Sequence, residues 1–284
     1  MVQTICICGS GTMGSGIAQA AAQHGIDTIL FDVQPAALEK AQAGIEKNLQ
    51  LLADKQKITA ADHQQIRNRI RYVSNIRECR AEVIIEAIVE KLAAKTSLLN
   101  QLAEINDKHT ILATNTSSLS VTDIAREVAH PGRVIGMHFF NPATIMKLVE
   151  VVQTTYTHEQ TTQRIVALAR QMGKTPVLCK DAPGFIVNHV ARPYYLESLK
   201  LVEMGISNYE TIDRLLEATG FKMGPFRLMD LIGNDINYAV SCQVYEALGK
   251  PERLKPSPLQ KEKVATGALG RKTGNGYYVY TAKQ

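Results

Sequence analysis

TICICGSGTMG, residues 4–14, joins an apolar run to a glycine-rich turn and then to the start of a helical pattern. Its glycines have the spacing GxGxxG. Gly9 permits a tight turn, Gly11 lets the backbone approach a pyrophosphate, and Gly14 lets the helix pack closely on the strand. The helix N-terminus then offers its N–H groups to an anion. The segment therefore predicts a dinucleotide-binding loop made of Gly9, Ser10, Gly11, Thr12, Met13 and Gly14.

The acidic residue that such a site needs follows the next predicted strand, Thr28–Phe31. Asp32 lies about 20 residues after Gly11, the separation expected for a carboxylate that binds the adenosine ribose. It would accept hydrogen bonds from ribose hydroxyls and repel a 2′-phosphate. The next residues are Val33 and Gln34, with no arginine. We therefore expect NAD in preference to NADP.

The first two thirds of the chain alternates β-rich runs with helical patterns. This alternation is typical of βαβ units and predicts an α/β fold with a Rossmann-type, doubly wound, mostly parallel sheet. Two polar helical patterns, at about 35–56 and 60–69, predict a helical hairpin inserted at about residues 35–70. The predicted strands are Thr4–Cys8, Thr28–Phe31, Val83–Glu86, Thr110–Ala113, Val134–Phe139, Leu148–Val152 and Pro176–Cys179.

The segment Asp181–Gly184 ends this alternation, and the patterns after it are helical. We expect an NAD-binding domain at residues 1–182 and a smaller all-α domain for substrate binding and dimerisation at residues 183–284. The apolar stretch Leu228–Leu248 predicts one long helix with more than one buried side. A small helical domain cannot hide such a helix alone, so we expect a homodimer through the C-terminal domain.

Composition excludes several classes of function. The chain has 284 residues, 45% of them hydrophobic, and a net charge of +5. Its basic residues are scattered, which argues against a nucleic-acid partner, and no apolar run is long enough to span a membrane. The five cysteines lack paired CxxC spacing, so neither a disulfide framework nor a metal site is indicated. This cysteine usage and the lack of an N-terminal targeting pattern favour a reducing cytoplasm.

Chemistry is suggested by two neighbouring segments, GMHFFNP at 136–142 and MKLVE at 146–150. His138 lies in a strongly apolar predicted strand and Glu150 in the next one, where the two side chains can lie side by side. A carboxylate that fixes the tautomer of an imidazole makes the ring a better proton acceptor for an alcohol. On the residues alone, a hydrogen-bonded core histidine and a solvated glutamate remain the commoner alternative.

Eight segments, in their order and spacing, resemble the L-3-hydroxyacyl-CoA dehydrogenase family, most closely its bacterial 3-hydroxybutyryl-CoA dehydrogenases. The segments are GSGTMGSGIAQ, EAIVE, TNTSSLS, GMHFFNP, MKLVEVV, CKDAPGFIVN, MGPF and GRKTGNGYY. The resemblance covers nearly the whole chain. It departs at ATIMK, residues 143–147, where many relatives have VPVMK, and both versions are small and apolar.

The resemblance implies that His138 is the general base and Glu150 its orienting partner, with Ser117 and Asn188 completing the catalytic site. Ser117 directly follows the strand that ends in ILATN, at the edge where open α/β sheets bind ligands. It is therefore expected to contact substrate and cofactor. Alternatively, Ser117 is the N-cap of a helix. Its neighbour Ser118 could also take either role in its place.

The same resemblance implies further cofactor contacts from Glu90, Lys95, Asn141 and, in the C-terminal tail, Lys272. It also implies that the helical hairpin near residues 48–57 binds the CoA part of the substrate. Asn48 and Lys55 stand at the matching positions of that hairpin. For Lys55, the alternative is an ordinary exposed lysine on a solvated helix.

The expected activity is the reversible oxidation of (S)-3-hydroxybutyryl-CoA, or another short-chain (S)-3-hydroxyacyl-CoA, to the 3-ketoacyl-CoA with NAD. Two alternatives remain. One is a dehydrogenase of a free 3-hydroxy acid, such as carnitine or a sugar acid, and the other is a non-catalytic NAD-binding sensor. The sequence sets neither the acyl chain length nor the physiological direction.

Overall fold

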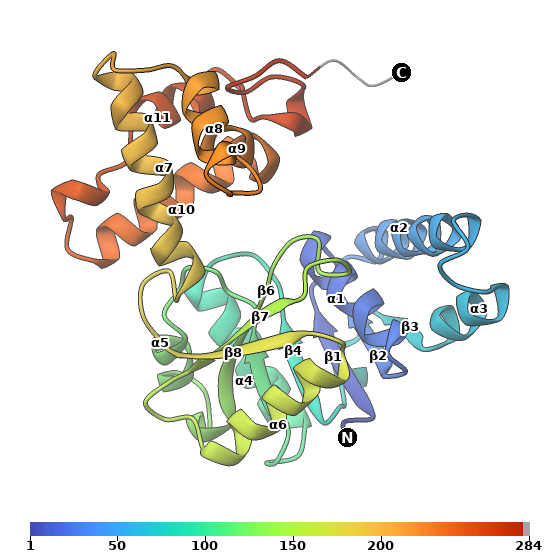
Figure 1. Ribbon diagram of the computed structural model, residues 1–284. Coiled ribbons are helices and arrows are strands. Elements are labelled where there is room, and N and C mark those ends of the chain that lie inside the picture. The colour runs from blue at the N-terminus through green and yellow to red at the C-terminus, as the bar shows by residue number, and fades with distance from the viewer. Residues whose placement is uncertain (281–284) are drawn as a thin grey trace. The chain divides into compact units, whose positions relative to one another are not determined.

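The computed structural model describes residues 1–280, and the chain divides into two compact units between Ala182 and Pro183. The first unit contains a single eight-stranded sheet with the order β3-β2-β1-β4-β5-β6-β7-β8 (Figure 1). All neighbouring strands run parallel except β6 and β7, which are antiparallel. The strands are β1 Thr4–Cys8, β2 Asp27–Phe31, β3 Ile70–Val73, β4 Val83–Glu86, β5 Ile111–Thr114, β6 Val134–Phe139, β7 Leu148–Gln153 and β8 Thr175–Lys180.

Helices cover both faces of this sheet, because alternate residues of each strand enter two separate apolar cores. In β1, Ile5 and Ile7 point into one core, while Cys6 and Cys8 point into the other. The first core is closed by α1 Thr12–Gln23, α2 Pro35–Asp54 and α6 Glu159–Gln171, and the second by α4 Leu92–Ile105 and α5 Val121–Arg126. This arrangement confirms the predicted Rossmann-type, mostly parallel fold.

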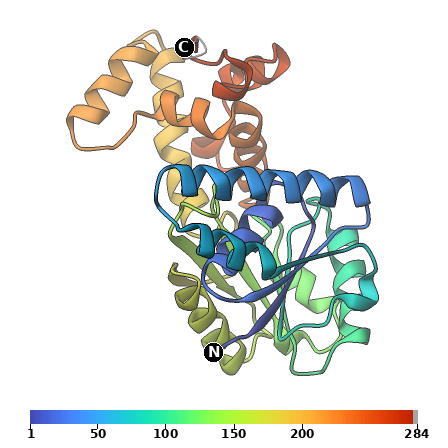
Figure 2. The ribbon, with the colours of Figure 1, turned by 90° about the vertical axis from the view of Figure 1, so that its right-hand side faces the viewer.

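The predicted helical insertion is present as α2 and α3 Ala60–Asn68, which lie next to each other (Figure 2). A capping box starts α3: the Thr59 side chain accepts from the backbone N–H of Asp62, whose carboxylate accepts from the backbone of Thr59. The strand that follows, β3, was not predicted. It is short, pairs only with β2 at the edge of the sheet, and carries the exposed Arg71, so its apolar signal is weak.

The second unit is built from α7 Val187–Glu203, α8 Tyr209–Ala218, α9 Pro225–Ile232, α10 Asn234–Ala247 and α11 Pro258–Ala265. The prediction of one helix over Leu228–Leu248 is wrong. Gly233 separates α9 from α10 with φ of 105°, a conformation that L side chains rarely adopt and that ends a helix. The sequence is apolar on both sides of Gly233, so its pattern does not reveal where α9 ends and α10 begins.

The C-terminal tail of the second unit is fixed to α9 by Asp230. Its buried carboxylate accepts hydrogen bonds from the backbone N–H groups of Tyr277 and Tyr278 and from the Tyr280 hydroxyl. Gly276 lies directly against it, since a Cβ there would be 2.0 Å from Asp230 Oδ1. The glycines of the GRKTGNGYY segment thus include one that lets the tail approach a buried carboxylate.

Within residues 1–280, no helix has both the length and the apolar character needed to cross a membrane.

Replacing Gly14 with Ala is expected to destabilise the protein, because the new Cβ would lie 1.7 Å from the carbonyl oxygen of Gly9. Relief of this overlap requires a backbone shift between β1 and α1, at a cost of about 1–3 kcal/mol. Gly11→Ala is the matched control, since nothing lies within 4 Å of a Cβ at that position. Thermal unfolding of both variants tests the expectation, and equal melting temperatures would contradict it.

Candidate active site

A cleft of about 920 Å³ opens at the carboxyl ends of the central strands. It is lined by the segments that follow β1, β2, β4 and β6, together with residues of α1, α2 and α4. The order of the sheet reverses at β1, with β2 on one side and β4 on the other. Open α/β sheets bind their ligands in the crevice at this position.

The geometry of the glycine loop fits a pyrophosphate. A Cβ at Gly9 would lie 2.6 Å from the carbonyl oxygen of Ala87, so the turn tolerates no side chain there. A Cβ at Gly11 would project into open space, where a ligand can approach the backbone. The first turn of α1 contains no acidic residue, and its N-cap, Gly11, supplies no side-chain cap. The N–H groups at this end of α1 therefore suit an anion.

Asp32 lies on the wall of the same cleft and is fixed by its neighbours. Its Oδ2 atom accepts hydrogen bonds from the backbone N–H and the hydroxyl of Ser10, both at 2.9 Å. Its Oδ1 atom accepts from the backbone N–H of Gln34 at 3.0 Å. The carboxylate thereby ties the glycine loop to the end of β2. Its position fits the ribose hydroxyls of a dinucleotide.

Other predicted residues divide between the cleft and the core. Thr12 and Asn141 line the cleft. Asn48 also lines it, from α2, and its Nδ2 atom lies 3.4 Å from Oε1 of Gln19. Met13 instead packs against the apolar core, so within the glycine loop it serves the packing of α1.

Glu90 is the centre of a hydrogen-bond network beside β5. Its Oε1 atom accepts from the Thr116 hydroxyl, from the Ser117 backbone N–H at 3.1 Å and from the Ser118 hydroxyl at 3.0 Å. Burial raises the pKa of Glu90, but the charge of Lys95 and these hydrogen bonds outweigh burial, so the pKa lies below its usual value. Glu90 is therefore a carboxylate that fixes the loop carrying Ser117.

Lys95 lies beneath this network, only 1% exposed. Its Nζ atom is 3.1 Å from Glu90 Oε2 and 2.7 Å from Oε1 of Glu86, which is fully buried. Glu86 also accepts from the Thr114 hydroxyl at 2.7 Å. These contacts satisfy the buried ammonium from two sides. Lys95 contacts the carboxylates that shape the site, and it is absent from the lining of the cleft.

His138 and Glu150 are direct partners across the antiparallel pair β6 and β7. His138 Nδ1 lies 2.8 Å from Glu150 Oε2. His138 is 5% exposed and Glu150 is fully buried. The His138 ring also contacts that of Phe140, with 4.6 Å between centroids. A buried carboxylate at Nδ1 orients the ring and selects the tautomer in which Nε2 accepts a proton.

Ser117 lies near the same edge of the sheet. It follows β5, which pairs with β6, and the backbone N–H of Phe139 donates to the Asn115 side chain at 2.8 Å. This bond links the segment leading to Ser117 with the strand that holds His138. The first unit thus brings Ser117 and the His138–Glu150 pair to neighbouring strand ends.

Two further predicted residues belong to the second unit, and a third lies at the end of α2. Asn188 is near the start of α7 in the second unit. Lys272, in the same unit, forms an ion pair with Asp235, with Nζ 2.6 Å from Oδ1. Lys55 caps the C-terminus of α2, is exposed, and does not line the cleft.

Lys174 supports the site and was not predicted. Its Nζ atom donates to the carbonyl oxygens of Ala143 at 2.5 Å and Met146 at 2.9 Å. The ammonium thereby holds the loop that follows Asn141, part of which lines the cleft. Burial lowers the pKa of Lys174. Both of its partners are backbone carbonyls, which every residue has, so the sequence could not predict these contacts.

Comparison with known proteins gives consistent matches. Residues 4–182 match the family described as "3-hydroxyacyl-CoA dehydrogenase, NAD binding domain", and residues 184–280 match "3-hydroxyacyl-CoA dehydrogenase, C-terminal domain". The "3-hydroxyadipyl-CoA dehydrogenase" of Escherichia coli is 45% identical over 100% of this chain and 60% of its own length. The "probable 3-hydroxybutyryl-CoA dehydrogenase" of Bacillus subtilis is 41% identical over 99% of both chains.

A solved structure has the same fold. The crystal structure of 3-hydroxybutyryl-CoA dehydrogenase from Escherichia coli K12 superposes with a TM-score of 0.96 at 44% identity. The alignment covers 100% of this chain and 61% of that one. The chain thus spans about three fifths of the length of two of these proteins and nearly the full length of the Bacillus subtilis relative.

Replacing Glu90 with Gln should lower stability at neutral pH by roughly 0.5–1.5 kcal/mol, the net range for a hydrogen bond, because the Glu90 side chain is 32% exposed and solvent weakens its contacts. Because the pKa of Glu90 is lower in the folded chain, its contribution is present above the pKa of the unfolded chain. It is lost as the pH falls through the folded-state pKa. Urea unfolding across the acidic range measures the difference between the variant and the unmodified chain.

The exposed Glu104 of α4 provides the matched control as Glu104→Gln, with little change expected at any pH. A stability difference for Glu90→Gln that stays constant down to strongly acidic pH would contradict the depressed pKa.

Proposed function

The chain belongs to the 3-hydroxyacyl-CoA dehydrogenase family, and on this basis we propose that it oxidises a short-chain (S)-3-hydroxyacyl-CoA reversibly to the 3-ketoacyl-CoA with NAD. The observation that carries the proposal is the buried His138–Glu150 pair at 2.8 Å, close to a cleft built for a dinucleotide. The preferred substrate is (S)-3-hydroxybutyryl-CoA, the substrate class in the names of two of the similar proteins.

The glycine loop and Asp32 would hold NAD, which when bound would accept the hydride from C3 of the substrate. His138 acts as the general base. Its Nε2 atom takes the proton of the 3-hydroxyl group, and the imidazolium formed is stabilised by Glu150 at Nδ1. In the reverse direction the same imidazolium donates the proton to the 3-keto oxygen. Both directions therefore use one proton carrier.

The remaining predicted residues have roles within this proposal. Ser117 and Asn188 hydrogen-bond the substrate oxygens and complete the catalytic group, and Ser117 and Asn141 also contact the cofactor. Asn48 and Lys55 of the α2–α3 insertion bind CoA, with Lys55 as a point charge for its phosphates. Lys272 contacts the cofactor after it leaves its ion pair with Asp235. Lys95 positions Glu90, which fixes the Ser117 loop.

The two units take separate tasks in this proposal. The first binds NAD, and the second binds substrate and forms a homodimer. The exposed apolar side chains Leu231, Ile232 and Ile236 at the junction of α9 and α10 support a protein interface on the second unit. A reducing cytoplasm is the proposed location, in keeping with the five free cysteines within residues 1–280.

A dicarboxylic substrate is the second candidate, because one relative is named a 3-hydroxyadipyl-CoA dehydrogenase. The two candidates share the CoA ester and the 3-hydroxyl chemistry and differ in the far end of the acyl chain. A free 3-hydroxy acid lacks the CoA that the α2–α3 insertion is proposed to bind.

The deciding experiment follows NADH consumption with acetoacetyl-CoA and, in parallel, with 3-ketoadipyl-CoA, free acetoacetate, and NADPH in place of NADH. Fast turnover requiring both a CoA ester and NADH is expected, and the ratio between the two esters identifies the acyl preference. Turnover of free acetoacetate would favour a free-acid dehydrogenase. Binding of NADH without turnover of any substrate would favour a non-catalytic sensor.

Replacing His138 with Gln should lower turnover by about 10²–10⁴-fold, the usual contribution of a general base, while the dissociation constant of NADH changes little. Glu150→Gln should also lower turnover and should alter the pH–rate profile, because the neutral amide no longer stabilises the imidazolium. Steady-state kinetics with acetoacetyl-CoA and NADH fluorescence titration measure the two effects. Near-normal turnover of the His138 variant would disprove its role.

A further inference from the structure

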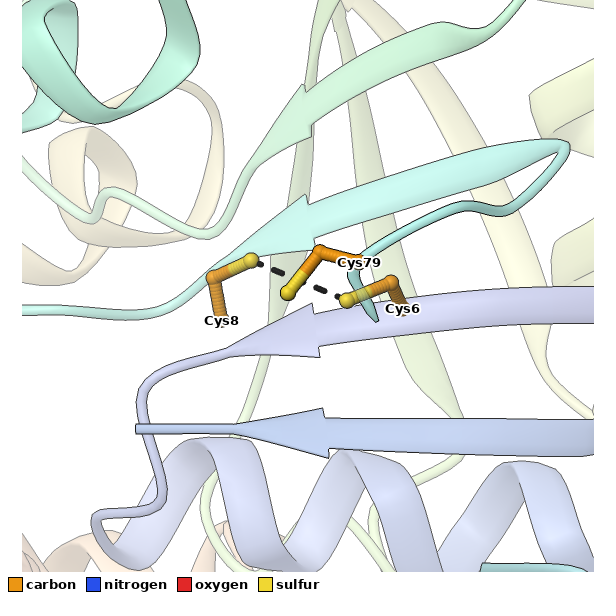
Figure 3. Close-up of side chains that lie close together, drawn as sticks. All are labelled: Cys6, Cys8 and Cys79. Carbon is orange, nitrogen blue, oxygen red and sulfur yellow. Dashed lines mark hydrogen bonds between the residues drawn. The ribbon is translucent and has the colours of Figure 1, made fainter. Parts of the chain in front are cut away.

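Three buried cysteines gather on the side of β1 that faces α4. Cys6 and Cys8 are two residues apart on this strand, so their side chains point to the same face. Cys79 reaches them from the connection before β4, directly after the short 3₁₀ helix η1 Ile76–Glu78 (Figure 3). All three cysteines are 0% exposed. Their Sγ atoms lie within 4.8 Å of one another, and those of Cys6 and Cys8 are 3.9 Å apart.

These distances fit three sulfurs around one metal ion better than they fit a disulfide. Metal–thiolate bonds are about 2.3 Å long, so three sulfurs in a trigonal arrangement lie about 4.0 Å apart. A disulfide needs sulfurs about 2.0 Å apart and uses only two of the three. The Cys6–Cys8 pair also lies near the upper limit of the Cα separation for a disulfide, because residues i and i+2 of a strand are about 6.6 Å apart.

The surroundings define the class of ion. The cluster belongs to the apolar core that also contains Phe31, Ile84 and Leu99, and the buried Glu86 of β4 is the register partner of Cys8. Within residues 1–280, the group of potential metal ligands at this position consists of the three cysteines alone. Hard ions such as Mg²⁺ and Ca²⁺ require oxygen ligands, and structural Zn²⁺ almost always takes four ligands. Thiolates select soft ions, of which Cu(I) accepts three sulfurs.

We infer that Cys6, Cys8 and Cys79 form a binding site for a single thiophilic cation, best matched by Cu(I). Copper–sulfur bonds form as the ion leaves its carrier ligands, and each thiol that becomes a thiolate releases one proton. No electron is transferred. The ion enters by displacement of η1, none of whose three residues is buried. Cys8 directly precedes Gly9, so the bound ion is attached to the strand that carries the dinucleotide loop.

The test titrates the reduced, full-length chain with the acetonitrile complex of Cu(I) under anaerobic conditions, in the presence of the chelator bicinchoninate. We expect one copper to be retained per chain against the chelator, with a thiolate-to-copper charge-transfer band in the ultraviolet. X-ray absorption should then report three sulfur ligands. Complete transfer of copper to the chelator, or fewer than three sulfurs, would overturn the proposal, as would preferential retention of Zn²⁺ from a mixture of both ions.

The chain provides its own matched controls. Cys79→Ala and Cys6→Ala should each lose the retained copper, while circular dichroism and melting temperature establish that they are folded. The double variant Cys179→Ala and Cys242→Ala removes the two cysteines outside the cluster and should retain copper as the unmodified chain does. Loss of copper from the double variant, or retention by either cluster variant, would contradict the assignment. The absorption measurement on the unmodified chain requires no variant to fold.

Discussion

The close contact of Gly14 with the carbonyl oxygen of Gly9 is the constraint on which the rest of the first unit depends. It fixes the distance between β1 and α1, because no side chain fits between them. With α1 held there, its N-terminus faces the cleft, and β1 stands where the order of the sheet reverses. The glycine loop, Asp32 and the segments after β4 and β6 then converge on one crevice. The cofactor site is thus a consequence of how one helix packs against one strand.

The success of sequence-based prediction in this chain depends on whether the deciding interactions are local. The strands Thr4–Cys8, Val83–Glu86 and Val134–Phe139 have the predicted bounds, because buried parallel strands are continuous apolar runs. The edge strand Ile70–Val73 has no such run and was missed. The stretch 228–248 shows the opposite failure, since the positive φ of Gly233 interrupts an apolar pattern that predicts a continuous helix.

The same distinction applies to the site. His138 and Glu150 lie on consecutive antiparallel strands, so their contact can be anticipated from residues twelve positions apart. Lys174 binds backbone carbonyls about thirty residues away, and Cys79 meets Cys6 and Cys8 from a different segment altogether. The hydrophobic periodicity of a sequence does not predict contacts between such distant residues. CxxC spacing concerns only cysteines that are close in the sequence. Metal binding depends on how close the sulfur atoms are in space, whatever their separation along the chain.

The antiparallel pairing of β7 is the feature that brings Glu150 to His138 at the end of the parallel sheet formed by β1 to β6. Because β7 turns back along β6, the first residues of β7 stand beside the last residues of β6, at the edge where the cleft opens. A slip of one residue would turn Glu150 to the opposite face, where Val149 and Val151 now enter the apolar core. Burial of these valines therefore fixes the register that brings a fully buried carboxylate to His138. Since burial of a carboxylate is costly, its contact with the imidazole stabilises this register, and each side chain stabilises the placement of the other.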